Sequence, residues 1–297
     1  MSILIDTHTK VLIQGITGRE GSRACRDMIS YGTHVVAGVT PGKGGSRVDN
    51  IPVYDSVLEA LYDHPDINIS LISVPGAFVR DAAFEALHAG VTLVVILTEH
   101  MPTQDSAMVI QYAQAKHARI IGPNSIGLIV PGRVKIGSIG SGDMHRVFRR
   151  GTIGIISKSG GMTSEIAFTL KKAGFGVSTA IGIGGDQMIG SDFADLLDLF
   201  ERDPETRAVV LFGEIGGTYE ERAAEHIRAK KFTKPVVALI AGRFSEYLPQ
   251  ETVLGHAGAI VNNGRGDYAS KVRTLKRAHV HVVTELEHIP TVLKENL

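Results

Sequence analysis

The chain has 297 residues, of which 43% are hydrophobic and 21% charged, and its 31 basic and 31 acidic side chains give a formal net charge of zero. This composition is typical of a globular protein of two domains of about 100–200 residues, and it argues against broad electrostatic binding to nucleic acid or to an anionic membrane. The single cysteine, Cys25, excludes an intrachain disulfide, and no apolar run reaches the ~18 residues of a membrane-spanning helix, so we expect a cytoplasmic protein.

The first half of the chain predicts strands that alternate with helices. Strands are expected at residues 10–14, 34–39, 67–74, 91–97 and 119–121, and each runs into a loop rich in glycine or polar residues. Such alternation predicts a parallel sheet with right-handed crossovers. The loops that follow the strands would then lie at one edge of the sheet, where ligands bind in folds of this class.

Two of these loops suggest a phosphate-bearing ligand. Gly15, Gly18 and Gly21 separate the first strand from a helix expected at 22–31, which is the arrangement that brings a phosphate to a helix N-terminus. A tight turn without any ligand explains this spacing equally well. The second strand leads to Lys43 among glycines, where an NAD-binding protein would carry an acidic residue. A lysine favours an additional phosphate, so coenzyme A or NADP fits this loop better than NAD.

A second series of strands begins after a span without clear periodicity. We interpret residues 1–128 as one domain, 129–150 as a linker and 151–297 as a second domain. Strands are expected there at 152–157, 177–181, 207–212, 235–240 and 280–283. The second half therefore repeats the order strand, glycine-rich loop, helix.

The loops of the second half carry the candidate catalytic residues. His256 lies between Gly255 and Ala257, so little bulk crowds its ring, and a neutral imidazole can accept a phosphoryl group and pass it on. Glu214 is the best candidate to hold this ring in one tautomer. A core histidine in a tight turn and a solvated or capping glutamate are the alternatives. Ser159, Gly160 and Gly161 open a helix whose N-terminus would attract phosphate, and Asp186 follows another strand.

These motifs occur in a specific order along the whole chain. The segments GITG, VTPGKGG, ILTE, IGPN, SKSGG, GIGGD, GEIGG and GHAGAI closely resemble the α subunits of the succinyl-CoA synthetase family, which are acid–thiol ligases that form a nucleoside diphosphate. The resemblance implies an α/β protein in which an N-terminal Rossmann-like CoA-binding domain precedes a flavodoxin-like, parallel-sheet ligase domain. It implies that the following residues contact coenzyme A: Thr17, Gly18, Arg19, Glu20, Lys43, Leu97, Thr98 and Glu99.

The same resemblance implies the chemistry and the partner. His256 would be transiently phosphorylated with Glu214 as its orienting partner, and Ser159, Gly160, Gly161 and Ser164 would form the loop for substrate or phosphate. The substrates would be a small carboxylic acid, coenzyme A and ATP or GTP with Mg²⁺. The nucleotide and the metal would lie mainly on a separate β subunit, in a heterodimer or heterotetramer, and no metal ligand is assigned to this chain.

The sequence departs from the family pattern at positions that affect which carboxylic acid is the substrate. Succinate-specific members read Ser-Gly-Thr-Leu-Thr-Tyr-Glu where this chain reads Ser-Gly-Gly-Met-Thr-Ser-Glu at 159–165, so Ser164 replaces a tyrosine. The Ser-Gly-Gly-Met sequence resembles ATP-citrate lyase and citryl-CoA synthetase instead. Succinate is the expected acid, with citrate or malate as the alternative. Two other classes of protein are also compatible with the sequence, an NADP-dependent oxidoreductase and a non-catalytic CoA-binding regulator.

Overall fold

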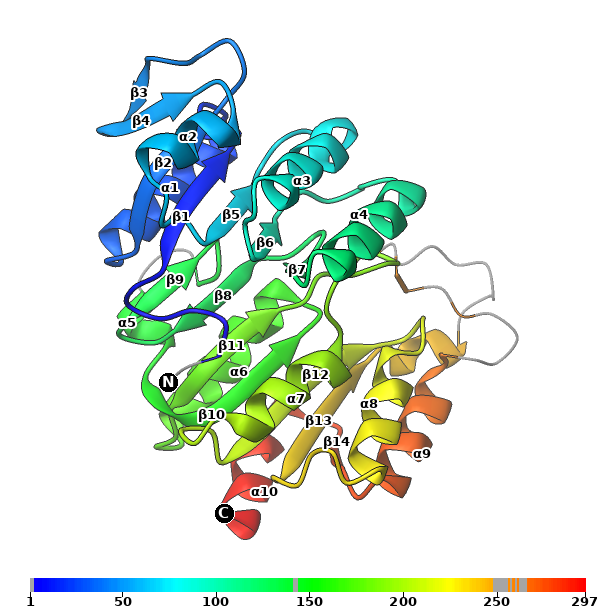
Figure 1. The fold of residues 1–297 in the computed structure, drawn as a ribbon. Coiled ribbons are helices and arrows are strands. Elements are labelled where there is room, and N and C mark those ends of the chain that lie inside the picture. The colour runs from blue at the N-terminus through cyan, green and yellow to red at the C-terminus, as the bar shows by residue number, and fades with distance from the viewer. Residues whose placement is uncertain (1–2, 141–143, 248–255, 257, 260, 262–265) are drawn as a thin grey trace.

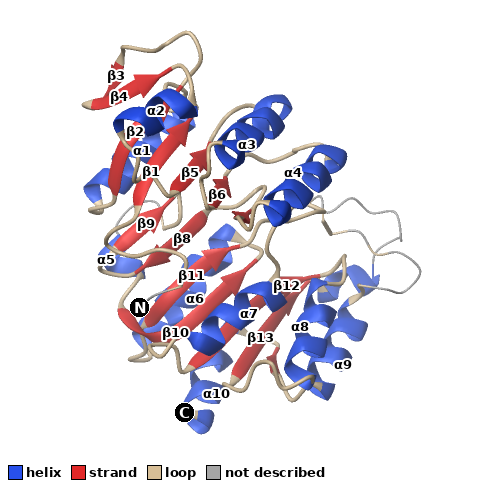
Figure 2. Cartoon of the chain, in the orientation of Figure 1, coloured by secondary structure: helices blue, strands red, loops and turns tan. Residues whose placement is uncertain are grey.

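The computed structural model describes residues 3–140, 144–247, 256, 258–259, 261 and 266–297. They form two seven-stranded sheets with helices on both faces of each sheet (Figures 1 and 2). The expected α/β class with two parallel-dominated sheets is confirmed.

The first sheet has the strand order β3-β4-β2-β1-β5-β6-β7. Every neighbouring pair is parallel except β3 and β4. Counted without β3, the chain order across the sheet is 3-2-1-4-5-6, which is the order of dinucleotide-binding domains. The strands are β1 (Lys10–Gln14), β2 (His34–Val39), β3 (Arg47–Val48), β4 (Ile51–Tyr54), β5 (Ile69–Ile72), β6 (Leu93–Ile96) and β7 (Arg119–Ile121), and the helices are α1 (Arg19–Ser30), α2 (Val57–Asp63), α3 (Val79–His88) and α4 (Thr103–Ala115).

The second sheet has the strand order β14-β13-β12-β10-β11-β8-β9. Its five parallel strands follow the order 2-1-3-4-5 of the flavodoxin-like fold, whose ligand crevice opens between the first and third strands, here β10 and β12. The parallel strands are β10 (Arg150–Ser157), β11 (Val177–Gly182), β12 (Ala208–Glu214), β13 (Val236–Ala241) and β14 (His281–Val283), and the helices are α6 (Gly160–Lys172), α7 (Phe193–Arg202), α8 (Tyr219–Arg228), α9 (Tyr268–Arg277) and α10 (Ile289–Asn296).

The span 129–150 differs from the linker that we expected. It includes the second half of β8 (Gly127–Val130), all of β9 (Val134–Ile136) and the short helix α5 (Met144–Val147). Strand β8 pairs antiparallel with β11 and with β9, so this hairpin extends the second sheet toward the first, as Figure 1 shows. Strands of three or four residues give too short a pattern to recognise from sequence periodicity. We therefore propose that the second domain begins near residue 127.

One apolar core joins the two sheets. Alternate residues of β1 point to opposite faces, so Val11 and Ile13 pack with Met28 of α1, whereas Leu12 packs on the side of α2, α3 and α4. The cluster that holds Met28 continues through β8 and β9 to α7, α8 and α9 of the second sheet. A separate cluster lies under α6 and α10. The two halves are thus packed against one another rather than tethered.

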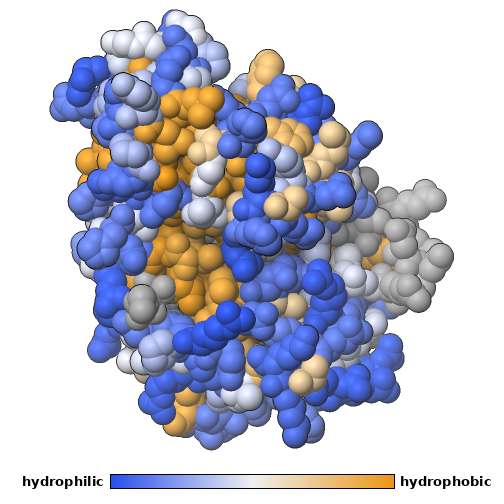
Figure 3. Space-filling model, viewed as in Figure 1, coloured by the Kyte–Doolittle hydropathy of each residue, from blue (hydrophilic) through white to orange (hydrophobic). Residues whose placement is uncertain are grey.

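The face of the molecule drawn in Figure 3 is largely hydrophilic. On the face drawn in Figure 3, hydrophobic residues gather around β1 and over β8 and β11, and polar residues surround them. Within the described ranges, no helix has both the length and the apolar character needed to cross a membrane.

Candidate active site

The loop after β1 is shaped by its glycines. Gly15 has a φ of +84°, and a Cβ there would lie 2.4 Å from the carbonyl oxygen of Ser73. A Cβ at Gly21 would lie 2.2 Å from the carbonyl oxygen of Gly15, so only glycine lets α1 start this close to the strand. The N-cap residue of α1 is Gly18, which provides no side-chain cap. The first turn of α1 therefore retains N–H groups that can donate hydrogen bonds to a phosphate.

A cavity of about 960 Å³ lies between the two domains. It extends from the start of α1, past the loops after β5 and β6, to the start of α6. Of the expected CoA and substrate residues, nine line it: Gly18, Arg19, Glu20, Leu97, Thr98, Glu99, Gly160, Gly161 and Ser164. The structure thus brings the two motif groups, more than 60 residues apart in the chain, onto one cavity.

Thr17 and Lys43 are not among the residues that line this cavity. The hydroxyl of Thr17 lies 3.1 Å from that of Thr40, and the Lys43 N–H donates to the carbonyl of Thr40 at 3.0 Å. The two residues therefore sit on adjoining loops, and the exposed Lys43 side chain extends from a turn that follows β2. Ser159 is also absent from the wall because it is the N-cap of α6, where its hydroxyl accepts from the Met162 N–H.

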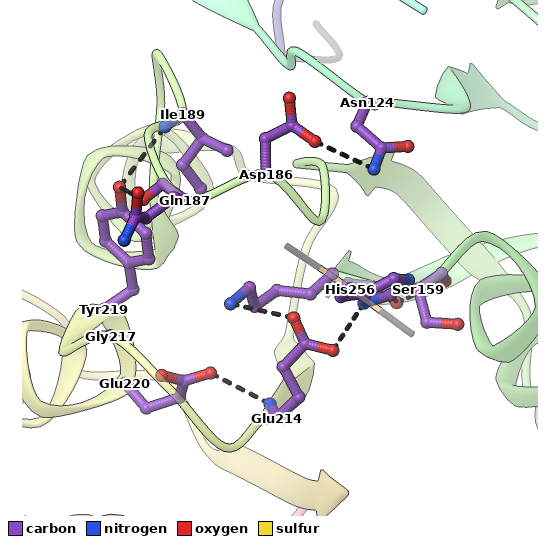
Figure 4. Close-up of polar contacts among 12 residues, drawn as sticks. Asn124, Ser159, Asp186, Gln187, Ile189, Glu214, Gly217, Tyr219, Glu220 and His256 are labelled. Atoms are coloured by element: carbon purple, nitrogen blue, oxygen red, sulfur yellow. Dashed lines mark hydrogen bonds and ion pairs between the residues drawn. The ribbon is translucent and has the colours of Figure 1, made fainter. Parts of the chain in front are cut away.

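A polar contact links the loops of the two domains above the candidate histidine. The Asn124 side chain donates to Asp186 Oδ1 at 3.0 Å, and both are labelled in Figure 4. The neighbouring Gly185 accepts from the N–H of Gly258, two residues after His256. A Cβ on Gly185 would lie 3.0 Å from the His256 ring, so this glycine leaves the space that the ring fills. His256 and Gly258 thus both lie against the loop after β11.

The side chains of His256, Glu214 and Lys158 form a connected network of polar contacts at the ends of β10 and β12. The Nδ1 atom of His256 lies 2.6 Å from Oε2 of Glu214, as Figure 4 shows, and Oε1 of Glu214 lies 3.1 Å from Nζ of Lys158. Lys158 is almost fully buried, while the His256 side chain keeps about a third of its surface exposed. If Nδ1 is the protonated nitrogen that donates to Glu214, the other nitrogen, Nε2, keeps its lone pair for an electrophile.

The pKa values of the pair move in opposite directions. The hydrogen bond to Glu214 raises the pKa of His256 above its ordinary value, against the effect of burial, and the charges of Glu214 and Asp186 add to the rise. Burial alone would raise the pKa of Glu214, but its hydrogen bond with His256 and the charge of Lys158 lower that pKa overall. Each partner thus favours the charged form of the other.

Some expected features lie outside the described residues, and one contact was not anticipated. Gly255, Ala257 and Ile260 of the histidine motif are among those outside. Lys158 was not predicted as a site residue from the sequence. It lies between the end of β10 and the N-cap of α6, however, and ligands bind at this position in folds of this class. Among the described residues, no group of three or more His, Cys, Asp and Glu side chains is arranged to hold a metal ion.

Two family models match the chain. The model described as a CoA binding domain matches residues 6–100, and the model described as CoA-ligase matches residues 156–281. The α subunit of ADP-forming succinate–CoA ligase from Methanothermobacter thermautotrophicus is 49% identical, over 95% of this chain and 92% of its own length. The chain belongs to the CoA-ligase family that includes these α subunits. Its enzyme class is therefore carboxylate–CoA ligase, and the oxidoreductase alternative is set aside.

Other members of this CoA-ligase family act on other acids. A subunit of the ADP-forming sulfoacetate–CoA ligase from Bilophila wadsworthia is 42% identical over 99% of both chains. The structure of ATP citrate lyase from Methanothrix soehngenii, solved with citrate and coenzyme A, superposes with a TM-score of 0.91 at 25% identity. That match covers 99% of this chain but only 50% of the lyase, so the chain spans half of the larger protein.

Proposed function

We propose that this chain is the α subunit of a ligase that forms succinyl-CoA from succinate, coenzyme A and ATP or GTP, reversibly, by way of a phosphohistidine at His256. The 2.6 Å contact between His256 and Glu214 is the observation that carries this proposal. Glu214 accepts a hydrogen bond from the Nδ1–H group and so leaves the lone pair of Nε2 free to act as the nucleophile. The relatives of this chain include α subunits of succinate–CoA ligases, which makes succinate the first acid to test.

The reaction divides into three displacements. In the first, Nε2 of His256 attacks the terminal phosphorus of the nucleoside triphosphate and the nucleoside diphosphate leaves. In the second, a carboxylate oxygen of the acid attacks that phosphorus, the N–P bond breaks, and an acyl phosphate forms. In the third, the CoA thiolate attacks the acyl carbon and inorganic phosphate leaves. Glu214 stabilises the positive charge that the ring carries while it is phosphorylated.

The cavity fits coenzyme A by its chemistry. The uncapped N-terminus of α1 offers N–H groups to a phosphate, and Lys43 extends from the adjoining loop as a cation for a further phosphate. The part of the cavity beside α6 would take the acid and the thiol end of coenzyme A, because Gly160, Gly161 and Ser164 line it there. We assign the nucleotide and its Mg²⁺ mainly to the β partner, which completes the enzyme as a heterodimer or heterotetramer.

Sulfoacetate is the acid that competes most directly with succinate. Sulfoacetate and succinate each carry two anionic ends, and subunits named for sulfoacetate–CoA ligases are 42% identical to this chain over its whole length. Citrate and malate remain weaker alternatives because the lyase match is at 25% identity. Ser164 in place of a tyrosine leaves room in the cavity for any of the larger acids.

A discharge assay tests the proposal. The chain is purified with its β partner and loaded with γ-³²P-labelled ATP or GTP and Mg²⁺, and acid-labile phosphate is sought on His256 by peptide mapping. Coenzyme A is then added with succinate, sulfoacetate, malate or citrate in separate reactions. We expect succinate to discharge the phosphoenzyme fastest, and His256→Asn to take up no label while it still binds coenzyme A. Absence of acid-labile phosphate from the wild-type complex would refute the mechanism.

A further inference from the structure

Behind the proposed catalytic pair lies a second buried ion pair, between Glu220 of α8 and Lys271 of α9. We propose that Glu220 and Lys271 are positioning residues that fix the backbone of Glu214 and join the turn after it to the start of α9. This inference rests on the proposed function, because it assigns the pair a role in the phosphorylation of His256. Neither side chain enters the cavity, and neither is part of the three displacements.

The first contact that carries the inference is directed at Glu214. The backbone N–H of Glu214 donates to Oε1 of Glu220 at 3.1 Å, and Figure 4 shows this contact beneath the Glu214 side chain. Gly213 makes the approach possible, because a Cβ there would lie 2.6 Å from the same Oε1 atom. Glu220 therefore holds the end of β12 at the residue whose carboxylate meets His256.

The second group of contacts joins the turn after Glu214 to the start of α9. Lys271 donates to the carbonyl of Gly217 at 3.1 Å and pairs with the carboxylates of Glu220 and Glu221. The N–H of Gly216 donates to the carbonyl of Gly266 at 2.8 Å, just before α9 begins. One lysine thus joins the turn after Glu214 to the helix that follows the His256 segment. Figure 1 shows α8 and α9 side by side at this point.

The burial of this pair calls for an explanation beyond packing. The side chains of Lys271 and Glu220 are 0% and 1% exposed. Charges removed from water lose hydration that their mutual attraction repays only when the geometry is good, and apolar side chains of similar size commonly stabilise a core as well. An apolar pair would fill the same space but would leave the Glu214 N–H without its carboxylate acceptor. The charge is thus placed where it fixes a functional carboxylate.

The pKa of His256 is the measurement that distinguishes a positioning role from a purely stabilising one. The charged groups that act on this ring are Glu214 from β12, Lys158 from the end of β10 and Asp186 from the loop after β11. Glu220 and Lys271 are absent from that set and reach the ring only through Glu214. A displaced Glu214 would lower the pKa of His256 toward its ordinary value, whereas a loss of stability alone would leave it unchanged in the folded protein.

The experiment compares three variants of the full chain. The double variant Glu220→Leu/Lys271→Met replaces both fully buried charges by apolar side chains, and among the described residues the only other carboxylate that loses a contact is that of Glu221, whose side chain is 17% exposed. Glu220→Gln keeps an acceptor for the Glu214 N–H but removes the negative charge. Glu221→Gln is the matched control, because Glu221 also contacts Lys271 but has no contact with Glu214. The His256 pKa is followed by NMR of ¹⁵N-labelled histidine, assigned with His256→Asn, and phosphoryl loading is timed in the complex with the β partner.

We expect the double variant to fold and to bind coenzyme A with unchanged affinity, while the His256 pKa falls and loading slows by about tenfold to a hundredfold. Glu220→Gln should lie between the double variant and wild type, and Glu221→Gln should match wild type. A double variant with the wild-type pKa and loading rate would overturn the inference. If it fails to fold, wild-type behaviour of Glu220→Gln in both measurements would overturn it instead. A wild-type complex that takes up no label would refute the proposed function, while the pKa comparison would still test the positioning.

Discussion

Asn124 and Asp186 connect the two domains by a hydrogen bond of 3.0 Å between residues 62 positions apart in the chain. Asn124 follows β7, the last strand of the first sheet, and has a φ of +56°, which asparagine tolerates better than most residues. Asp186 follows β11 of the second sheet and adjoins Gly185, against which the His256 ring packs. Through this contact the CoA-binding domain touches the loop that supports the candidate histidine.

Asn124→Ala should therefore destabilise the folded chain. The Asp186 carboxylate is buried, and burial already raises its pKa, so the loss of a donor leaves a desolvated oxygen. We expect a loss of about 1–3 kcal/mol in the free energy of unfolding, measured in urea. Thr103→Ala is the control, because Thr103 meets the adjacent Gln187 only through an exposed contact of 3.5 Å. Equal losses in the two variants would contradict this account.

The regular strands were predictable because their pattern is local. The predicted bounds of β1, β2 and β7 agree with the structure, and each of these strands is built around consecutive apolar residues. The short strands β3, β4, β8 and β9 were missed, since antiparallel pairs of two to four residues owe their existence to a partner rather than to a period. The hairpin of β8 and β9 was for this reason mistaken for a linker.

Within the site, the sequence predicted one contact between side chains and missed the others. His256 and Glu214 were paired from their motifs, and the structure places them in hydrogen-bond contact. Lys158 and the pair of Glu220 with Lys271 were not predicted. The contact between Glu220 and Lys271 spans 51 positions, and nothing local marks either residue as buried. Only the packing of α8 against α9 brings their charges together.

Glu214→Gln should slow phosphorylation of His256 and change its dependence on pH. Phosphorylation requires the neutral ring, so its rate rises as pH rises through the pKa of His256. Glu214 raises this pKa. Removal of its charge should therefore shift the rising limb to lower pH and reduce the limiting rate by about a hundredfold or more, because an oriented tautomer and a stabilising charge are both lost. The time course of ³²P uptake between pH 5 and 9 measures both effects, and an unshifted limb would exclude this role for Glu214.

The same pair should stabilise the fold in a defined pH window. A raised histidine pKa contributes stability that is complete below the unfolded-state value of 6.5 and is lost as pH rises through the folded value. A lowered glutamate pKa contributes stability above the unfolded-state value of 4.5 and is lost as pH falls. Wild type and His256→Asn should thus differ most in unfolding free energy between about pH 4.5 and 6.5. Urea titrations across this range measure the difference, and a pH-independent difference would contradict the ion pair.

Lys43→Ala should weaken coenzyme A binding without affecting phosphorylation. Lys43 is exposed and lies outside the cavity wall, so its contribution would be a screened attraction for a phosphate. We expect a loss of about threefold to tenfold in affinity that shrinks as salt is added. Isothermal titration of coenzyme A at low and high salt measures this loss, with Lys294→Ala on α10 as the control. Equal loss of binding and of phosphoryl loading would show that the CoA site has been misplaced.

Ser164→Tyr should change the acid that the enzyme accepts. Ser164 lies on the first turns of α6 and lines the cavity, and a Cβ added at the nearby Gly161 would meet no atom within 4 Å. Packing thus does not require glycine at 161, and the two small residues leave this part of the cavity open. A phenol ring there would occupy space that larger acids need and would favour succinate over citrate. Differences of this kind commonly amount to about 10–200-fold in kcat/KM.

Ser164→Ala separates the effect of volume from that of the hydroxyl group. This control variant removes the oxygen but leaves the cavity as open as in wild type. If the volume of side chain 164 determines which acid is accepted, Ser164→Ala should keep the wild-type order of kcat/KM for succinate, sulfoacetate, malate and citrate. Only Ser164→Tyr should then change that order, by reducing kcat/KM for the larger acids. If both variants change the order alike, the hydroxyl group contacts the acid directly. If neither variant changes it, the acid is selected elsewhere on the cavity wall or by the β partner, and Ser164 has no part in specificity.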